Sequence, residues 1–262
     1  MKPAATAFLW NGTDFAPCEN VPLTDRGFRY GMALFESVAV RGGRAEFLDA
    51  HLARLEAAAR RCGWPMERAA WVRAGERLPQ LDGPAFARVY VTAGDGAPTA
   101  PVTAPRVFLF AEPREAAPQA AIRVRVHPEP FLPLFGGLKT ANYWANAEAL
   151  RQAREAGFGE ALLFNPRGEL VSACMANVFV ELGGRLVTPP LSSGARAGVT
   201  REWVMQRRAV AERGLTRADL QNATACFLTS CWAGIVPVAA LEERPLDTPF
   251  AETLRAEFFS RA

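Results

Sequence analysis

The sequence predicts an α+β fold that contains much antiparallel sheet and is divided into two domains. Two glycine-containing turns, Asn11-Gly12 and Gly42-Gly43, each separate two short apolar runs and predict β-hairpins. From Leu48 to Arg61, apolar residues instead recur at helical spacing. A polar, proline-containing stretch then divides the chain near its middle. Hairpins and amphipathic helices in separate segments are typical of the α+β class.

The first part of the chain alternates strands with helices. Its first hairpin turns at Asn11-Gly12, and the helix that begins at Leu48 stops before Gly63, because glycine commonly follows a helix end. The expected elements are the strands Ala5–Trp10, Thr13–Pro17, Ser37–Val40, Ala45–Leu48, Arg88–Thr92 and Arg106–Ala111, and the helices Leu48–Arg61 and Glu67–Arg77.

Residues Glu112 to Gln119 are polar and contain two prolines, a composition typical of a linker between domains. The sequence therefore predicts a small N-terminal α/β domain over 1–112, a linker over 113–120 and a larger domain over 121–262. In the larger domain we expect strands at Ile122–Val126, Ala161–Asn165, Glu169–Ala173, Asn177–Leu182, Arg185–Thr188 and Ala225–Thr229, and helices at Thr140–Ala156, Val199–Arg213 and Pro249–Phe259.

Composition excludes several classes of protein. The 262 residues carry a net charge of +3 with scattered arginines, which does not predict nucleic-acid binding. The five cysteines are irregularly spaced and odd in number, so a disulfide framework is not expected. No signal peptide or apolar stretch of membrane-spanning length is present, and a cytoplasmic protein without membrane contact is the expectation.

Lysine is almost absent from the chain. Of 30 basic residues, only Lys2 and Lys139 are lysine. Lys139 follows the apolar stretch Phe131–Leu138, whereas Lys2 lies at the terminus. Arginine cannot replace lysine where an amine must form a Schiff base, because the guanidinium group stays protonated. Lys139 is therefore a candidate catalytic amine, the alternative being a chance survivor of an arginine-rich composition.

Other common chemistries lack the residues that they need. The two histidines, His51 and His127, have no cysteine partner at metal spacing, so no metal site is predicted. Neither lies near a nucleophile elbow, and no P-loop or dinucleotide fingerprint is present.

Two segments could bind an anion such as a phosphate group. Gly198–Arg201 begins a predicted helix with accessible amide groups and the Thr200 hydroxyl, although an ordinary glycine helix start has the same pattern. Arg54, three residues after His51, has the geometry for a two-point phosphate contact, although a lone arginine is also common on a solvated helix face.

Seven short motifs along the chain resemble, in order, those of the class IV aminotransferases, the fold-type IV enzymes that use pyridoxal 5′-phosphate (PLP). These enzymes include branched-chain and D-amino-acid transaminases and 4-amino-4-deoxychorismate lyase. The motifs lie at Asp25–Gly31 with Leu34–Ser37, His51–Leu55, Leu138–Tyr143, Asn177–Phe179, Thr188–Pro190, Gly198–Arg201, and Leu228–Ser230 with Val236–Val238.

The resemblance implies a two-domain fold-type IV enzyme whose large domain contains an antiparallel sheet or barrel, and whose pocket is assembled in a homodimer. Lys139 would form the Schiff base and act as base at the substrate α-carbon, with a small-molecule amino compound as substrate. The implied cofactor-binding residues are Arg54, Tyr143, Ser172, Asn177, Val199, Thr200 and Thr229. The implied substrate-side residues are Arg29 and Glu36, to which Arg196 is added as a possible carboxylate anchor.

One departure from the family pattern concerns the cofactor's ring nitrogen. Ser172 stands where the family has a glutamate that keeps this nitrogen protonated, and Glu169 should point to the other face of its strand. A neutral ring is a weaker electron sink. Amino-acid transamination is the first expectation, with 4-amino-4-deoxychorismate lyase as one alternative and a repurposed, non-catalytic PLP-binding protein as another.

Overall fold

The computed structural model describes residues 6–80, 84–115 and 120–261. The chain forms two compact units, of which the first comprises Met1–Ala117 with Lys139–Asn142 and the second comprises Pro118–Leu138 with Tyr143–Ala262. Part of the predicted linker, residues 116–119, lies outside the described residues, as does Lys2. The predicted domain boundary therefore stays a prediction.

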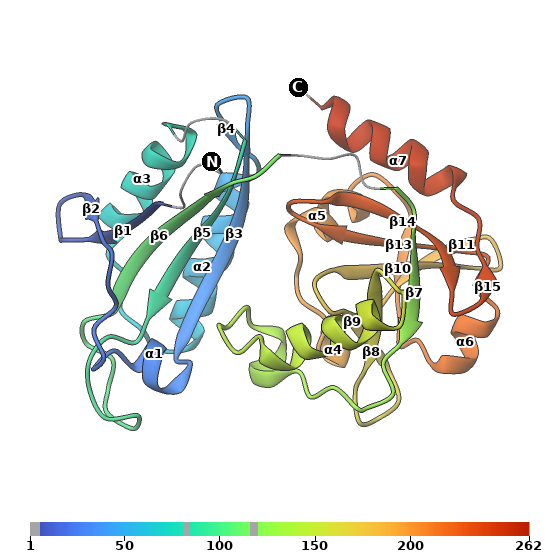
Figure 1. Ribbon diagram of the computed structural model, residues 1–262, viewed down its shortest axis with the longest axis horizontal. Coiled ribbons are helices and arrows are strands. Elements are labelled where there is room, and N and C mark those ends of the chain that lie inside the picture. The colour runs from blue at the N-terminus through green and yellow to red at the C-terminus, as the bar shows by residue number, and fades with distance from the viewer. Residues whose placement is uncertain (1–5, 81–83, 116–119, 262) are drawn as a thin grey trace. The chain divides into compact units, whose positions relative to one another are not determined.

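The first unit is built on one six-stranded sheet, shown in blue to green in Figure 1. Strands β3 and β5 pair antiparallel from Ala33 opposite Thr92 to Val40 opposite Ala85. Eight of the nine residues of β3 are buried, which fixes the register, because a one-residue slip would exchange the two faces. In sheet order the strands are β2 (Phe15–Pro17), β1 (Thr6–Trp10), β6 (Arg106–Pro113), β5 (Ala85–Thr92), β3 (Ala33–Arg41) and β4 (Arg44–Ala45).

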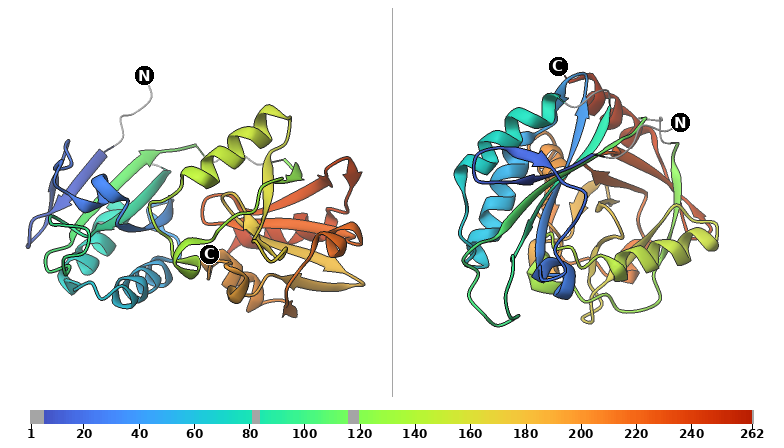
Figure 2. Two further views of the ribbon diagram at one scale, coloured as in Figure 1. Left: turned by 90° about the horizontal axis from the view of Figure 1, so that it is seen from below. Right: turned by 60° about the vertical axis from the view of Figure 1, so that its left-hand side comes forward.

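Helices α2 and α3 lie on one face of this sheet (Figure 2). Helix α2 packs its apolar stripe, including the buried Leu55 and Ala59, against β3. The helices of this unit are α1 (Arg26–Tyr30), α2 (Leu48–Arg61), α3 (Arg68–Arg77) and the short η1 (Leu78–Gln80).

The short segment Lys139–Asn142 pairs with β3 and so belongs to the first unit. The backbone N–H of Phe35 donates to the Lys139 carbonyl at 2.9 Å, and the N–H of Ala141 donates to the Ala33 carbonyl at 2.8 Å. The expected helix from Thr140 is therefore wrong at its start. These first residues satisfy their backbone groups in a bridge to β3, and the helix begins at Trp144.

The second unit is built on a nine-stranded mixed sheet. Strand β7 runs parallel to both of its neighbours, β14 and β8, whereas most other pairs are antiparallel. In sheet order the strands are β12 (Val210–Glu212), β11 (Arg185–Thr188), β10 (Asn177–Leu182), β13 (Ala225–Ser230), β14 (Gly234–Leu241), β7 (Ile122–Val126), β8 (Glu160–Phe164) and β9 (Leu170–Ala173), and β15 (Arg244–Pro245) pairs with β14.

This second sheet curls, because its last strand returns to its middle. Strand β9 ends the sheet, yet only Cys174–Ala176 separates it from β10. The curled sheet encloses a core that includes Leu162, Val178, Leu228 and Val238, all at most 2% exposed. The fold class predicted from the sequence is thus confirmed, with two sheets of the expected kind.

Helices cover the curled sheet of the second unit (Figure 1). The helix expected over Val199–Arg213 is wrong in its second half, since it ends at Met205 and β12 then pairs parallel with β11. The helices of this unit are α4 (Trp144–Glu155), α5 (Val199–Met205), α6 (Arg217–Gln221) and α7 (Pro249–Ser260), with the short η2 (Leu134–Gly137) and η3 (Leu191–Ser193).

Candidate active site

The amine of Lys139 lies in the first unit over an aromatic ring. Its Nζ atom is 4.0 Å from the centroid of the Phe35 ring, and its backbone carbonyl accepts from the Phe35 N–H at 2.9 Å. Phe35 in turn stacks on Tyr90, with ring centroids 5.2 Å apart. Pairing with β3 therefore holds the lysine backbone, while the aromatic face supports the amine through a cation–π contact.

Arg54 and Glu36, both expected from the sequence, are brought together in the first unit. Arg54 Nε donates to Glu36 Oε1 and Nη2 donates to Oε2, each at 2.6 Å. The Glu36 side chain is 1% exposed and that of Arg54 is 24% exposed. Burial alone would raise the pKa of Glu36, but the Arg54 charge and the hydrogen bond to His51 lower this pKa to about 2. The pair is therefore ionised near neutral pH.

His51 completes this buried cluster. Its Nδ1 lies 2.8 Å from Glu36 Oε2, and the ring is 2% exposed. Burial lowers the pKa of His51, against the opposing effect of Glu36, so the ring is neutral near pH 7. An ionised Glu36 can only accept, so Nδ1 must carry the hydrogen. The buried Nε2 has no hydrogen-bond partner among the described residues. No role for His51 could be predicted from the sequence, because its partner Glu36 is 15 residues away.

Arg29 lies apart from this cluster in the first unit. It is exposed on α1, with its guanidinium carbon 4.9 Å from the Tyr30 ring centroid. It lines a cavity of about 450 Å³ together with Thr24, Tyr30, Asp95, Gly96, Ala97 and Pro98. The lining carries one cation, Arg29, and one carboxylate, Asp95, and the substrate-side role expected for Arg29 stays a prediction.

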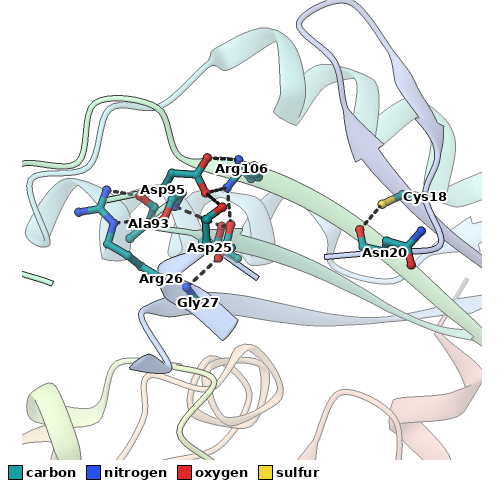
Figure 3. A network of polar contacts seen from close by, with 11 residues as sticks. Cys18, Asn20, Asp25, Arg26, Gly27, Ala93, Asp95 and Arg106 are labelled. Atoms are coloured by element: carbon teal, nitrogen blue, oxygen red, sulfur yellow. Dashed lines mark hydrogen bonds and ion pairs between the residues drawn. The ribbon is translucent and has the colours of Figure 1, made fainter. Parts of the chain in front are cut away.

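A network of charged groups shapes the wall of this cavity (Figure 3). The Arg26 side chain, 1% exposed, donates to the carbonyls of Ala93, Gly94 and Ala100 and so holds the loop after β5. Asp25 accepts from Arg106 Nη1 at 2.8 Å. No role was expected for Arg26, because only the fold shows that it is buried within the motif Asp25–Gly31.

Two buried hydroxyl groups in the second unit lack a partner. Thr200 on α5 and Thr229 on β13 are 3% and 1% exposed, and neither Oγ1 atom has a hydrogen-bond partner among the described residues. Helix α5 packs against β13. A buried hydroxyl without a partner is costly, so a bound polar group is the physical explanation of such a pair. Both residues are among those expected to bind the cofactor phosphate, and their chemistry fits that group.

Asn177 links the elements around these hydroxyls. It lies opposite Thr229 in the ladder of β10 and β13, and its Nδ2 donates to the Arg196 carbonyl at 2.9 Å. A Cβ atom on Gly198 would collide with Asn177 Oδ1, so any other residue there would displace the Asn177 amide. Val199 follows as the first residue of α5. The structure thus brings together Asn177, Thr229 and the start of α5, and their role as cofactor contacts stays a prediction.

Tyr143 and Arg196 also contact each other. The Arg196 guanidinium carbon is 4.7 Å from the Tyr143 ring centroid, and its Nη1 donates to Tyr143 Oη. Both side chains are half-buried. Separate roles were expected for Tyr143 and Arg196, because no sequence pattern indicates that a residue before α5 contacts the residue before α4.

Ser172 is half-buried on β9, opposite Leu163. Among the described residues, no acidic side chain forms a hydrogen bond with Ser172, and Glu169 binds Asn165 and Arg167 instead. Glu160 was not expected to have a role near this position. Its buried carboxylate accepts from the N–H groups of Cys174 and Met175 at 3.0 Å and thereby fixes the turn between Ser172 and Asn177. Burial raises the Glu160 pKa, although these N–H groups oppose the effect.

Two further findings concern the described residues alone. No group of three or more histidine, cysteine, aspartate or glutamate side chains is arranged there to hold a metal ion. None of the helices that these residues form combines the length and the apolar character that crossing a bilayer requires.

Comparison with protein families matches residues 33–241 to the family described as amino-transferase class IV. This match spans well over half of the chain. The chain belongs to the class IV aminotransferases. A putative branched-chain-amino-acid aminotransferase of Methanocaldococcus jannaschii is 29% identical, over 87% of this chain and 84% of that protein.

Other class IV relatives include lyases. The aminodeoxychorismate lyase of Vibrio harveyi is 25% identical, over 91% of this chain and 94% of that protein. The solved 4-amino-4-deoxychorismate lyase of Pseudomonas aeruginosa is 30% identical, with a TM-score of 0.85, and the similarity covers 96% of this chain and 97% of that one.

As a class IV aminotransferase, the chain is an enzyme of the PLP-dependent aminotransferase or lyase type. The alternative of a non-catalytic binding protein finds no support in these relatives.

Proposed function

We propose that this chain binds PLP and uses Lys139 to act at the α-carbon of a small amino compound. The observation that carries the proposal is the pair of buried, unpartnered hydroxyl groups of Thr200 and Thr229. Lys139 is the single lysine among the described residues, so it is the candidate for attachment of the cofactor. Arg54, Asn177 and Val199 are the further proposed cofactor contacts.

The roles of the side chains follow from their chemistry. When bound, PLP supplies a conjugated ring that stabilises negative charge at the substrate α-carbon. The Lys139 amine would hold the cofactor covalently, and in its free, unprotonated form it would accept the proton from the substrate α-carbon. Arg54, held rigid by Glu36, offers a cation to the phosphate, and the Thr200 and Thr229 hydroxyls donate to phosphate oxygens. The Tyr143 hydroxyl would donate to the phenolic oxygen of the ring.

Attachment at Lys139 is tested by borohydride reduction of the loaded protein and mapping of the labelled peptide. We expect label on the Lys139 peptide alone, and Lys139→Ala should abolish turnover without changing the circular dichroism spectrum. Label on Lys2, or no label although PLP is demonstrably bound, would refute the assignment.

Amino-acid transamination is the first proposed activity. The similarity to the Methanocaldococcus jannaschii aminotransferase over most of both chains supports it. The test is transfer of the amino group to 2-oxo acids from a panel of L- and D-amino acids. A reaction with one enantiomeric series would also identify the stereochemistry.

A lyase that eliminates pyruvate from 4-amino-4-deoxychorismate and gives 4-aminobenzoate is the second candidate. One observation favours it, because Ser172 supplies no carboxylate and Glu169 is bound by Arg167. An elimination that forms an aromatic product depends less on a deep electron sink than transamination does. Pyruvate release without amino transfer would establish this activity, and amino transfer without pyruvate release would exclude it.

The enzyme is proposed to be a homodimer and to lie in the cytoplasm. The proposed domains are residues 1–112 and 121–262. Exposed apolar side chains around α1 support the dimer: Leu23, Phe28 and Tyr30 are 75%, 64% and 41% exposed. Sedimentation equilibrium of the loaded enzyme should give twice the chain mass of 28.5 kDa. A monomer at working concentration would refute the dimer.

A further inference from the structure

Arg196 is held at two points in the second unit, by its backbone and by its guanidinium group. Its carbonyl accepts from Asn177 Nδ2 at 2.9 Å and from the Gly198 N–H at 2.8 Å. Its side chain stacks on the Tyr143 ring and donates to Oη. One residue thus connects the start of β10, the loop before α5 and the residue before α4.

The direction of the hydrogen bond between these side chains is fixed by chemistry. A guanidinium group has only donors, so Tyr143 Oη must accept from Arg196. The hydrogen of the phenol is then directed away from Arg196. A phenol that accepts from a cation is also a stronger donor, because consecutive hydrogen bonds polarise one another.

The positive charge of Arg196 is not neutralised by a neighbouring acid. Arg196 forms no ion pair with a carboxylate in the part of the chain that the structure describes. The charge therefore acts on the Tyr143 oxygen at close range. In the same unit, position 172 carries a serine that cannot supply an opposite charge to a ring nitrogen.

We infer that Arg196 is a positioning residue that orients and polarises the Tyr143 hydroxyl toward the phenolic oxygen of the cofactor. This inference rests on the proposed PLP function and extends it. Negative charge on the cofactor would then be stabilised at the phenolic oxygen, through Tyr143 and the Arg196 cation. The ring nitrogen would contribute less to this stabilisation. Arg196 would act through Tyr143 and would not bind the cofactor or a substrate carboxylate itself.

A double-mutant cycle on PLP affinity tests this inference. Fluorescence titration of apo-protein with PLP should give dissociation constants raised roughly two- to tenfold by Arg196→Met and by Tyr143→Phe, since each removes one hydrogen bond. The double variant should match Tyr143→Phe within about twofold, because Arg196 has nothing left to position. Effects that multiply would mean that Arg196 acts directly, and would overturn the inference.

The absorption spectrum of the loaded protein gives a second readout, which a purely structural role would not move. The pH midpoint of the cofactor's visible absorption change should rise in both single variants, because each weakens the stabilisation of an anionic oxygen. Arg196→Lys should restore part of the wild-type value. An unchanged midpoint in Arg196→Met would overturn the inference.

The controls separate folding and charge from positioning. Arg207→Met removes an exposed guanidinium that stacks on Trp203, with 4.5 Å from its carbon to the ring centroid, and should leave PLP affinity unchanged. If Arg196→Met does not fold, Arg196→Gln takes its place in the cycle. A wild-type protein that binds no PLP would overturn the proposed function and this inference together, whereas PLP binding with multiplying effects would overturn the inference alone.

Discussion

Arg54 donates two hydrogen bonds to the Glu36 carboxylate, both with a nitrogen–oxygen distance of 2.6 Å, and His51 donates to the same carboxylate. The positive partner reaches partly into solvent, whereas the acid and the histidine are almost fully buried. The charges of the three groups are therefore coupled. The stability of the folded protein should depend on pH through them.

Acid should weaken the fold through Glu36. Its pKa of about 2 in the folded protein is below the ordinary 4.5, so the folded state binds fewer protons. The resulting stabilisation is present above pH 4.5 and is lost as the pH falls toward 2. Burial lowers the His51 pKa from 6.5 and adds loss of the same sign at low pH. Urea unfolding of Glu36→Gln between pH 7 and about pH 2.5 should show a weaker acid dependence than that of the wild type, by roughly 2–3 kcal/mol over this range.

Glu56→Gln is the matched control for this measurement, because Glu56 pairs with Arg60 on the exposed side of α2. Its acid dependence should equal that of the wild type. The same acid dependence in Glu36→Gln would contradict the buried ion pair.

Removal of Arg54 should weaken PLP binding. Arg54→Ala deletes the cation proposed to bind the phosphate, and charge-assisted hydrogen bonds contribute about 1.5–3 kcal/mol, or roughly 10- to 150-fold in affinity. Arg60→Ala, on the same helix, should bind PLP as the wild type does. Equal PLP affinity in Arg54→Ala and Arg60→Ala would restrict Arg54 to its structural partnership with Glu36.

Replacement of the two unpartnered threonines should have opposite effects on stability and on binding. Thr229→Val and Thr200→Val keep the shape and remove a buried hydroxyl that has no partner, so the apo-protein should unfold at equal or higher urea concentration. PLP affinity should fall several-fold. Thr188→Val is the matched control, because the equally buried Thr188 donates to the Val178 carbonyl at 2.8 Å. It should lower the stability of the apo-protein, and a loss of the same size in Thr229→Val would show that its hydroxyl has a protein partner.

A carboxylate at position 172 should strengthen the electron sink. Ser172→Glu places a negative charge where a ring nitrogen is proposed to lie, and an opposite charge favours the protonated ring. Transaminase turnover should rise, and absorbance from long-lived carbanionic species should persist longer after substrate is mixed in. Wild-type transaminase turnover within the ordinary range of about 1–10³ s⁻¹ would show that Ser172 does not limit this turnover.

Local sequence patterns predicted the elements whose signals are themselves local. Helix α2 has the predicted bounds because its apolar spacing and Gly63 mark both its face and its end. Strands β10 and β11 also match, since Gly183-Gly184 supplies the turn between two β-rich runs.

The errors arose where distant partners decide the local structure. Residues after Lys139 pair with β3, about a hundred positions earlier in the chain, and β12 exists because β11 accepts it as a parallel neighbour. The same reason explains the overlooked site residues. His51, Arg26 and Glu160 each have an ordinary local context, and their importance follows from the buried groups that only the fold brings to them.

The pairing of Lys139–Asn142 with β3 has a consequence for cutting the chain into parts. The polypeptide enters the first unit again after leaving it, so a fragment that ends before residue 139 lacks a piece of that unit's sheet and its lysine. Each half expressed alone would leave without partners the backbone groups that pair β3 with residues 139–142 in the whole chain. Nicking the chain near residue 115 should therefore leave the two fragments associated, and activity should survive a cut that separate expression would not tolerate.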